Sequence, residues 1–253
     1  MTYSYRESFK IRMNEADTKG FLRPDALTGL LQETAGNHAK KLQFDIADLQ
    51  EKNCTWILHK LHFKMNGYPR WRDTITIETW PSSGNRLLAY RDFRILNQQN
   101  ELLGLAVSHW IIFDLIKKRP VRISNSILKL GADIEEHVLP VDSDIVTSSE
   151  KDLKVRNRFE VHFSDLDMNN HLNNTVYVRC ILDSLPVKTA EAGYCKELII
   201  KFKSEATYGN RIKSCLAGLD DSAYTHKLFS EDSSSCHAEA NSVWKSMKSL
   251  ESS

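Results

Sequence analysis

The sequence predicts an α+β protein made of two copies of one unit, each with a long helix and several strands. Three observations carry this prediction. A strand pattern near the N-terminus leads into one long amphipathic helix, and a series of strand patterns that can pair antiparallel follows the helix. The same order of residue types then begins again in the second half of the chain, which is typical of an internal duplication.

The first unit begins with a strand pattern at residues 5–13, where apolar and polar residues alternate. Gly20 breaks the pattern, and Pro24 suits the first turn of a helix, where its missing amide proton costs nothing. A helix is predicted over residues 24–41, because one mostly apolar face recurs at helical spacing: Leu27, Leu30, Leu31, Thr34, Ala35 and His38. We expect His38 to lie in the core or at its edge.

Five further strand patterns follow, at residues 54–65, 73–80, 87–97, 101–113 and 119–123. One long helix wrapped by such an antiparallel sheet is the hotdog fold. Residues 124–152 match no strand pattern and are rich in Ser, Asp, Glu and Val, so they are predicted to be a linker with one helical turn near residues 127–130.

The pattern restarts after this linker. Residues 9–17 align with residues 159–167 without a gap, at an offset of 159 − 9 = 150. The two segments agree in residue class along their length. In the same alignment, the first helix corresponds to a second predicted helix at residues 174–185. Its apolar face holds Tyr177, Cys180, Ile181 and Leu185. The sequence therefore predicts a hotdog at 1–123, a linker at 124–152 and a second hotdog at 153–253, paired like two single hotdogs in a dimer.

Composition excludes several classes of function. The formal net charge of +1 argues against a nucleic-acid binder that relies on overall charge. The five cysteines are scattered and form no CxxC pair, so they predict reduced thiols, no metal site and no cofactor held by such a site. The N-terminus shows no signal or transit pattern, and the apolar run 102–113 is too short to span a bilayer. We expect a cytoplasmic protein of bacterial type.

Polar side chains that could take part in catalysis are concentrated in residues 164–177, which hold two Asp, four Asn and one His. His171 is the natural acid or base, since an imidazole titrates near neutral pH. In an extended segment, Asp167, Asn169 and His171 would point to the same face. Asn173 and Asn174 suit a helix N-terminus instead, where Asn side chains cap free amides.

This run resembles the signature of the plant plastid acyl-ACP thioesterases and their bacterial relatives, Asp-x-Asn-x-His-Val-Asn-Asn followed by Tyr. The stretches 31–39, 75–80, 91–92 and 108–110 are similar to that family too, so the resemblance covers about residues 5–245. It implies that Asp167, Asn169 and His171 are catalytic. It also implies hydrolysis of acyl-ACP to free fatty acid, which ends chain elongation, with the acyl carrier protein as partner.

A fourth catalytic residue is implied at the end of a strand predicted over residues 197–205. Taken alone, Glu205 would be a surface residue. The plant enzymes place a catalytic Glu followed by Cys here, and this chain has Glu205 followed by Ala206. A covalent route through a cysteine at that position is therefore excluded, and we expect attack by water or through carboxylate chemistry.

The first copy keeps Asp17 at the place of Asp167 but has Lys19 for Asn169 and Phe21 for His171. We therefore expect the first unit to bind the acyl chain and the second to carry the chemistry. The expected groove is the apolar helix face with Leu27, Leu30, Leu31 and Thr34. The amides that begin the helix at 174–185 are expected to stabilise the oxyanion.

Other functions stay open at this point. An acyl-CoA thioesterase would differ in the carrier it accepts, and a non-catalytic acyl-binding hotdog protein would bind without turnover. A hotdog dehydratase fits less well, because four polar site residues fall in one half of the chain. The duplication already supplies the usual hotdog pairing, which leaves a homodimer of tandem hotdogs open.

Overall fold

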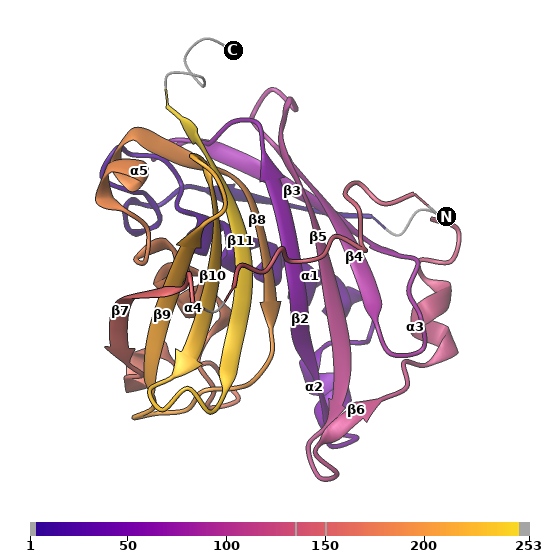
Figure 1. The fold of residues 1–253 in the computed structure, drawn as a ribbon. Coiled ribbons are helices and arrows are strands. Elements are labelled where there is room, and N and C mark those ends of the chain that lie inside the picture. Colours follow the sequence, from indigo (N-terminus) through magenta and orange to yellow (C-terminus); the bar gives the residue numbers. More distant parts are fainter. Residues whose placement is uncertain (1–3, 135, 150, 248–253) are drawn as a thin grey trace. The chain divides into compact units, whose positions relative to one another are not determined.

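The computed structural model of the chain describes residues 4–134, 136–149 and 151–247, and it forms two compact units, Met1–Asp142 and Ser143–Ser253 (Figure 1). The boundary between the units falls inside the segment 124–152 that the sequence predicts as a linker. Each unit has antiparallel strands and helices of its own.

The first unit follows the predicted order of strand, long helix and strands. Its strands form one antiparallel sheet in the order β1-β3-β4-β5-β2, with β6 paired to the outer end of β5. The elements are β1 (Tyr5–Lys10), η1 (Met13–Glu15), α1 (Pro24–Lys41), α2 (Ile46–Gln50), β2 (Cys54–Met65), β3 (Thr74–Ser82), β4 (Ala89–Leu96), β5 (Leu102–Asp114), β6 (Arg119–Val121) and α3 (Asn125–Lys129). The helix predicted at 24–41 is confirmed at both ends, and α3 confirms the helical turn near 127–130.

The apolar face of α1 lies against β1 and β3 and forms the core of the first unit. Leu27, Leu31 and Phe93 are at most 1% exposed, so the helix and the sheet bury their apolar faces against each other. His38 on the same face is buried, stacks on Tyr5 at 5.4 Å and has its Nδ1 2.8 Å from an Arg91 nitrogen. The prediction of a core histidine is confirmed.

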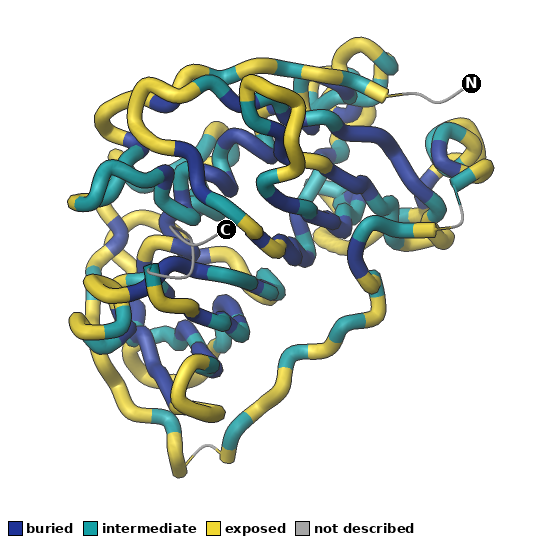
Figure 2. Tube along the Cα trace, turned by 90° about the horizontal axis from the view of Figure 1, so that it is seen from above, coloured by how far each residue is buried: buried dark blue, intermediate teal, exposed yellow. Residues whose placement is uncertain are grey.

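The chain after α3 is fastened to the sheet of the first unit through buried polar groups. The fully buried Asp92 carboxylate accepts the Val138 amide at 2.9 Å, and its other oxygen lies 2.9 Å from Nδ1 of His137. His137 also meets the Ser83 hydroxyl at 3.1 Å, and the Lys60 ammonium donates to the Val141 carbonyl at 2.9 Å. These contacts explain why residues 137–142 belong to the first unit. The chain is exposed or half-buried from residue 143 to residue 149 (Figure 2).

The second unit repeats the order of the first. Its sheet runs β8-β11-β10-β9-β7, and these strands take the places of β2, β5, β4, β3 and β1. The elements are β7 (Lys154–Glu160), η2 (Phe163–Asp165), α4 (Asn174–Leu182), α5 (Val187–Ala192), β8 (Gly193–Phe202), β9 (Arg211–Gly218), β10 (Ala223–Ser230) and β11 (Cys236–Ser246). The shared strand order confirms the internal duplication. The second long helix ends at Leu182, before the predicted end at 185, although Leu185 is still buried.

Candidate active site

The segment Asp167–Leu172 connects η2 to α4 as a tight turn. One oxygen of the Asp167 carboxylate accepts the amides of Asn169 at 2.8 Å and His171 at 3.1 Å, and the Asp167 amide donates to the His171 carbonyl at 2.8 Å. Asn170 lies between them with a φ of 60°, in the left-handed region that Asn tolerates. The expectation of an extended segment is therefore wrong, because the Asp167 carboxylate closes the backbone into a turn.

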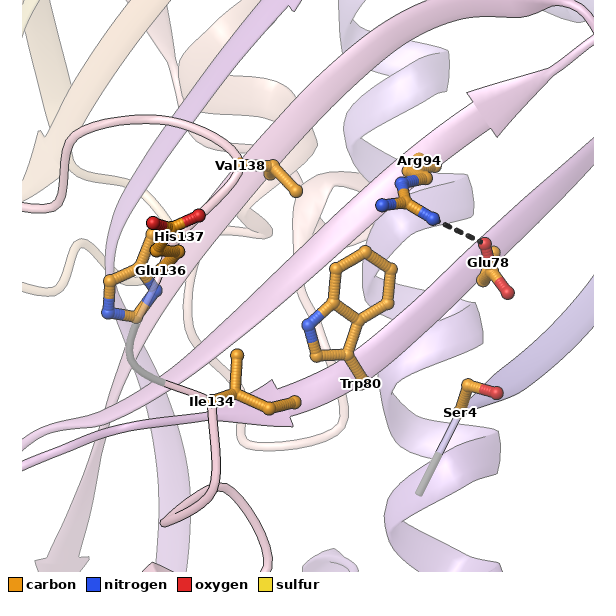
Figure 3. Close-up of a pocket in the computed structure, with 8 residues that line it drawn as sticks. All are labelled: Ser4, Glu78, Trp80, Arg94, Ile134, Glu136, His137 and Val138. Carbon is orange, nitrogen blue, oxygen red and sulfur yellow. Dashed lines mark ion pairs between the residues drawn. The ribbon is translucent and has the colours of Figure 1, made fainter. Parts of the chain in front are cut away.

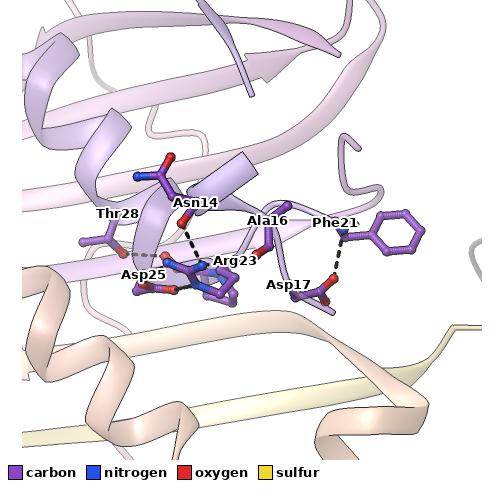
Figure 4. Close-up of polar contacts among 8 residues, drawn as sticks. Asn14, Ala16, Asp17, Phe21, Arg23, Asp25 and Thr28 are labelled. Atoms are coloured by element: carbon purple, nitrogen blue, oxygen red, sulfur yellow. Dashed lines mark hydrogen bonds and ion pairs between the residues drawn. The ribbon is translucent and has the colours of Figure 1, made fainter. Parts of the chain in front are cut away.

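The first unit builds the same turn without the reactive side chains (Figure 4). One oxygen of Asp17 accepts the amide of Phe21 at 2.9 Å, the bond drawn in the figure, and it also accepts the Lys19 amide at 2.8 Å. Gly20 has a φ of 82° where the second unit has Asn170. The Asp is thus kept in the copy that has lost the imidazole. The contacts that Asp17 and Asp167 share are the hydrogen bonds that hold the turn.

The structure brings His171 and Glu205 together from two loops. Nε2 of His171 lies 3.1 Å from a carboxylate oxygen of Glu205, with the side chains 32% and 51% exposed. The loops meet because the Leu172 amide donates to the Ala206 carbonyl at 2.8 Å. Glu205 lies beyond the end of β8 at Phe202, so the strand predicted to reach 205 ends earlier. Asn169 belongs to the same turn and is half-buried.

Three amides at the start of α4 already have acceptors within the protein. Asn173 caps the helix, and its side-chain oxygen accepts the Thr175 amide at 2.9 Å. The amides of Val176 and Tyr177 donate to the Asn173 carbonyl at 2.9 and 3.4 Å. The capping role predicted for Asn173 is confirmed, and the expected oxyanion role of these amides is wrong because they already have acceptors.

The cysteines fit structural roles. All five are free thiols, and Cys180, Cys195 and Cys215 are buried. Burial raises the pKa of the Cys180 and Cys195 thiols, so both stay protonated and are poor nucleophiles. Among the described residues, no group of three or more His, Cys, Asp or Glu side chains is arranged to hold a metal ion. Within the same residues, no helix combines the length and apolar character needed to cross a membrane.

The residues expected to form the acyl groove, Leu27, Leu30, Leu31 and Thr34, are at most 6% exposed in the core of the first unit. A hollow of about 580 Å³ exists elsewhere in that unit, and it contains none of them (Figure 3). Trp80 forms part of its wall under the Arg94 guanidinium, which also pairs with Glu78 at 3.7 Å. An acyl chain would have to part α1 from the sheet to reach the four residues, so their role stays a prediction.

A further residue at the site is Tyr177, which sequence reasoning places only on the buried face of the helix. Its ring is 3% exposed, and its hydroxyl donates to the Ser204 carbonyl at 3.3 Å, next to Glu205. The signal for this contact was present in the sequence, since a buried tyrosine requires a partner for its hydroxyl. The acceptor, the Ser204 carbonyl, lies in a loop that is distant in the sequence, so the sequence alone does not identify it.

Two family models match the chain. Residues 2–130 match the acyl-ACP thioesterase N-terminal domain, and residues 148–246 match the acyl-ACP thioesterase C-terminal domain. The chain belongs to the acyl-ACP thioesterase family. The family resemblance predicted from the motif at 164–177 is thereby confirmed.

Two curated relatives of this thioesterase-family chain are plant proteins. It is 27% identical over 248 residues to a chloroplastic acyl-[acyl-carrier-protein] hydrolase of Cuphea viscosissima, covering 89% of this chain and 58% of that protein. It is 26% identical over 228 residues to a chloroplastic palmitoyl-acyl carrier protein thioesterase of Arabidopsis thaliana, covering 84% and 55%. The chain thus spans less than two thirds of the length of either relative.

Solved structures of the family share the fold. An acyl-ACP thioesterase from Bacteroides thetaiotaomicron superposes with a TM-score of 0.87 at 22% identity, over 96% of this chain and 98% of that one. A 12:0-ACP thioesterase from Umbellularia californica gives a TM-score of 0.84 at 19% identity, over 97% and 98%. These likenesses confirm the predicted tandem hotdog fold.

Proposed function

We propose that this protein hydrolyses the thioester of acyl-ACP to free fatty acid and ACP, and so ends fatty acid chain elongation. The observation that carries the proposal is the contact of 3.1 Å between His171 and Glu205. It lies on the turn that carries the family motif, and the first unit, which has Phe21 in place of His171, lacks it. A partly exposed imidazole held by a carboxylate is suited to proton transfer near neutral pH.

The reaction requires water to add to the thioester carbonyl and the C–S bond to break. In one route, the His171 imidazole takes the proton of the attacking water, Glu205 stabilises the imidazolium, and the imidazolium then protonates the departing thiolate. In the other, the Glu205 carboxylate takes the proton of the attacking water and passes it to the His171 imidazole 3.1 Å away, which then protonates the departing thiolate. Both routes use the same pair, and neither needs a cysteine.

The other two predicted catalytic residues take supporting roles in this proposal. Asp167 holds the turn through the amides of Asn169 and His171. The first-turn amides of Thr175, Val176 and Tyr177 already have acceptors. The carboxamide of Asn169 is therefore the candidate donor to the oxyanion.

The test is thiol release from acyl-ACP substrates of eight to eighteen carbons, measured beside the matching acyl-CoA series. We expect turnover with a preference for the ACP carrier. His171→Ala should reduce kcat by about a hundredfold or more, the usual contribution of a positioned acid or base. His162→Ala is the matched control, because this imidazole is 71% exposed in the same unit and lies outside the pair.

Each outcome decides between the functions that the sequence leaves open. Equal or better turnover of acyl-CoA would make the protein a general acyl thioesterase. Binding of acyl-ACP without thiol release would make it an acyl-binding protein. An unchanged rate in His171→Ala, with acyl-ACP turned over by the wild type, would remove the assigned pair from the mechanism.

A further inference from the structure

Glu205 needs support that its own loop does not supply. Residues 203–205 and 207–210 are all exposed, and the Glu205 side chain is 51% exposed. An exposed glutamate samples many rotamers, and a loop displacement of about 1 Å at a reacting group costs as much as a hundredfold in rate. Some contact from the rigid part of the unit must therefore hold the backbone on which Glu205 is placed.

Tyr177 makes that contact from α4. Its ring packs edge-on against Phe202 at 5.7 Å between centroids, and its hydroxyl donates to the Ser204 carbonyl at 3.3 Å. Burial raises the pKa of the Tyr177 hydroxyl, so it stays protonated and can donate. The phenol thus holds the backbone directly before Glu205.

The first unit shows what the site looks like without this contact. Its Leu22 amide donates to the Pro69 carbonyl at 2.9 Å, as the Leu172 amide does to Ala206, so Pro69 takes the place of Ala206. Leu27 takes the place of Tyr177, since 177 − 27 and 172 − 22 are both 150.

Leucine has no hydroxyl, so the tyrosine contact is missing in the first unit. The counterparts of His171 and Glu205 there are Phe21 and Tyr68, at offsets of 150 and 137. The tyrosine contact therefore occurs in the copy that carries the acid–base pair and is lost in the copy that lacks it. A tyrosine required only for helix packing would have no reason to follow that division.

We propose that Tyr177 is a positioning residue that holds Glu205 against His171, an inference that rests on the proposed hydrolytic function. Tyr177 touches the backbone beside Glu205 and reaches the chemistry only through it. A second contact shares the task, because the Ser204 hydroxyl lies 3.0 Å from Nδ1 of His237 and donates to the Cys236 carbonyl at 3.1 Å. Loss of the phenol oxygen should therefore loosen Glu205 without releasing it.

The test is Tyr177→Phe, which removes one oxygen and keeps the ring against Phe202. We expect kcat for acyl-ACP to fall about tenfold with KM nearly unchanged, because the substitution loosens a reacting group and removes no contact proposed for substrate binding. Tyr224→Phe is the matched control. Its hydroxyl pairs with the Thr189 hydroxyl at 2.9 Å in the same unit, away from Glu205, and its loss should leave kcat unchanged.

A double-mutant comparison shows whether the tyrosine acts through Glu205. In a Glu205→Gln background, Tyr177→Phe should cause little further loss of kcat, since the carboxylate that it positions is gone. A second tenfold loss there would overturn the inference. A fall in melting temperature of more than about 10 °C in Tyr177→Phe would also overturn it, by assigning the hydroxyl to the stability of the fold.

A measurement independent of turnover separates this inference from the proposed function. Crystal structures of the wild type, Tyr177→Phe and Tyr224→Phe give the distance between Nε2 of His171 and the Glu205 carboxylate, which is 3.1 Å in the wild type. In Tyr177→Phe we expect this distance to lengthen or the Glu205 side chain to lose order, and in Tyr224→Phe we expect no change. An unchanged, ordered contact in Tyr177→Phe would refute the inference even if the protein hydrolyses acyl-ACP. A displaced Glu205 would support it even if the substrate proves to be another thioester.

Discussion

The role of Asp167 can be separated from that of a reacting carboxylate by two substitutions. Asp167→Asn keeps a side-chain oxygen that can accept the amides of Asn169 and His171, but it removes the charge. Asp167→Ala removes both. If Asp167 holds the turn, the Asn variant should retain most of the activity and the Ala variant should lose most of it. If the carboxylate instead takes part in proton transfer, both variants should lose activity to the same extent.

The size of the effect follows from the two hydrogen bonds, at 2.8 and 3.1 Å. A bond to a charged acceptor contributes about 1.5–3 kcal/mol when buried, and less at a half-exposed site such as this one. We expect Asp167→Ala to destabilise the unit by about 2 kcal/mol and Asp167→Asn by about 1 kcal/mol or less. The Ala variant should also reduce kcat about a hundredfold, because the turn that carries His171 loses its closure.

The duplication provides the control. Asp17 makes the equivalent bonds to Lys19 and Phe21 at 2.8 and 2.9 Å, in a turn without an imidazole. Asp17→Ala should therefore cost a similar stability and leave kcat nearly unchanged. Stability is measured by urea unfolding and kcat by thiol release from acyl-ACP.

Two results would refute this reasoning. If Asp167→Asn is folded and as inactive as Asp167→Ala, the carboxylate takes part in the chemistry. A loss of kcat in Asp17→Ala as large as in Asp167→Ala would show that activity follows general stability, and the local turn would then have no special part.

Three further predictions test other parts of the structure. His226 is fully buried between two serine hydroxyls, and burial lowers its pKa to about 3 from 6.5, so the unfolded chain binds a proton that the native state does not. The contribution of His226 to the free energy of unfolding should thus be complete above pH 6.5 and fall toward pH 3, with about 2 kcal/mol lost by pH 5. In His226→Asn, the free energy of unfolding measured with urea should depend less steeply on pH. Ala206→Cys should not raise kcat, since Ala206 is 0% exposed; an acyl-cysteine trapped at this position and seen by mass spectrometry, with a gain in rate, would contradict the cysteine-free mechanism. Asn173→Ala should lower the free energy of unfolding by about 1 kcal/mol through loss of the α4 cap, and an unchanged melting temperature would show that the cap bond to Thr175 contributes nothing.

Local patterns in the sequence were sufficient for the elements and the repeat. The helix at 24–41 follows from helical spacing of apolar residues and from Pro24, and both act within a few residues of each other. The strands lie close to their predicted places because alternation is also local, and the duplication is a comparison of the sequence with itself. The family resemblance implied His171, through the motif at 164–177, and Glu205, through a separate match, as residues of one site.

Only the tertiary structure decided how those residues are arranged. The spacing of Asp167, Asn169 and His171 suits a strand, but the Asp167 carboxylate bonds two amides and closes a turn, a choice that alternation does not reveal. The contact between His171 and Glu205 depends on a backbone bond between distant loops, and the hydroxyl of Tyr177 finds its acceptor in one of them. Such contacts join residues far apart in the chain, and their geometry is set by how α4 packs on its sheet. Periodicity within one segment carries no information about that packing.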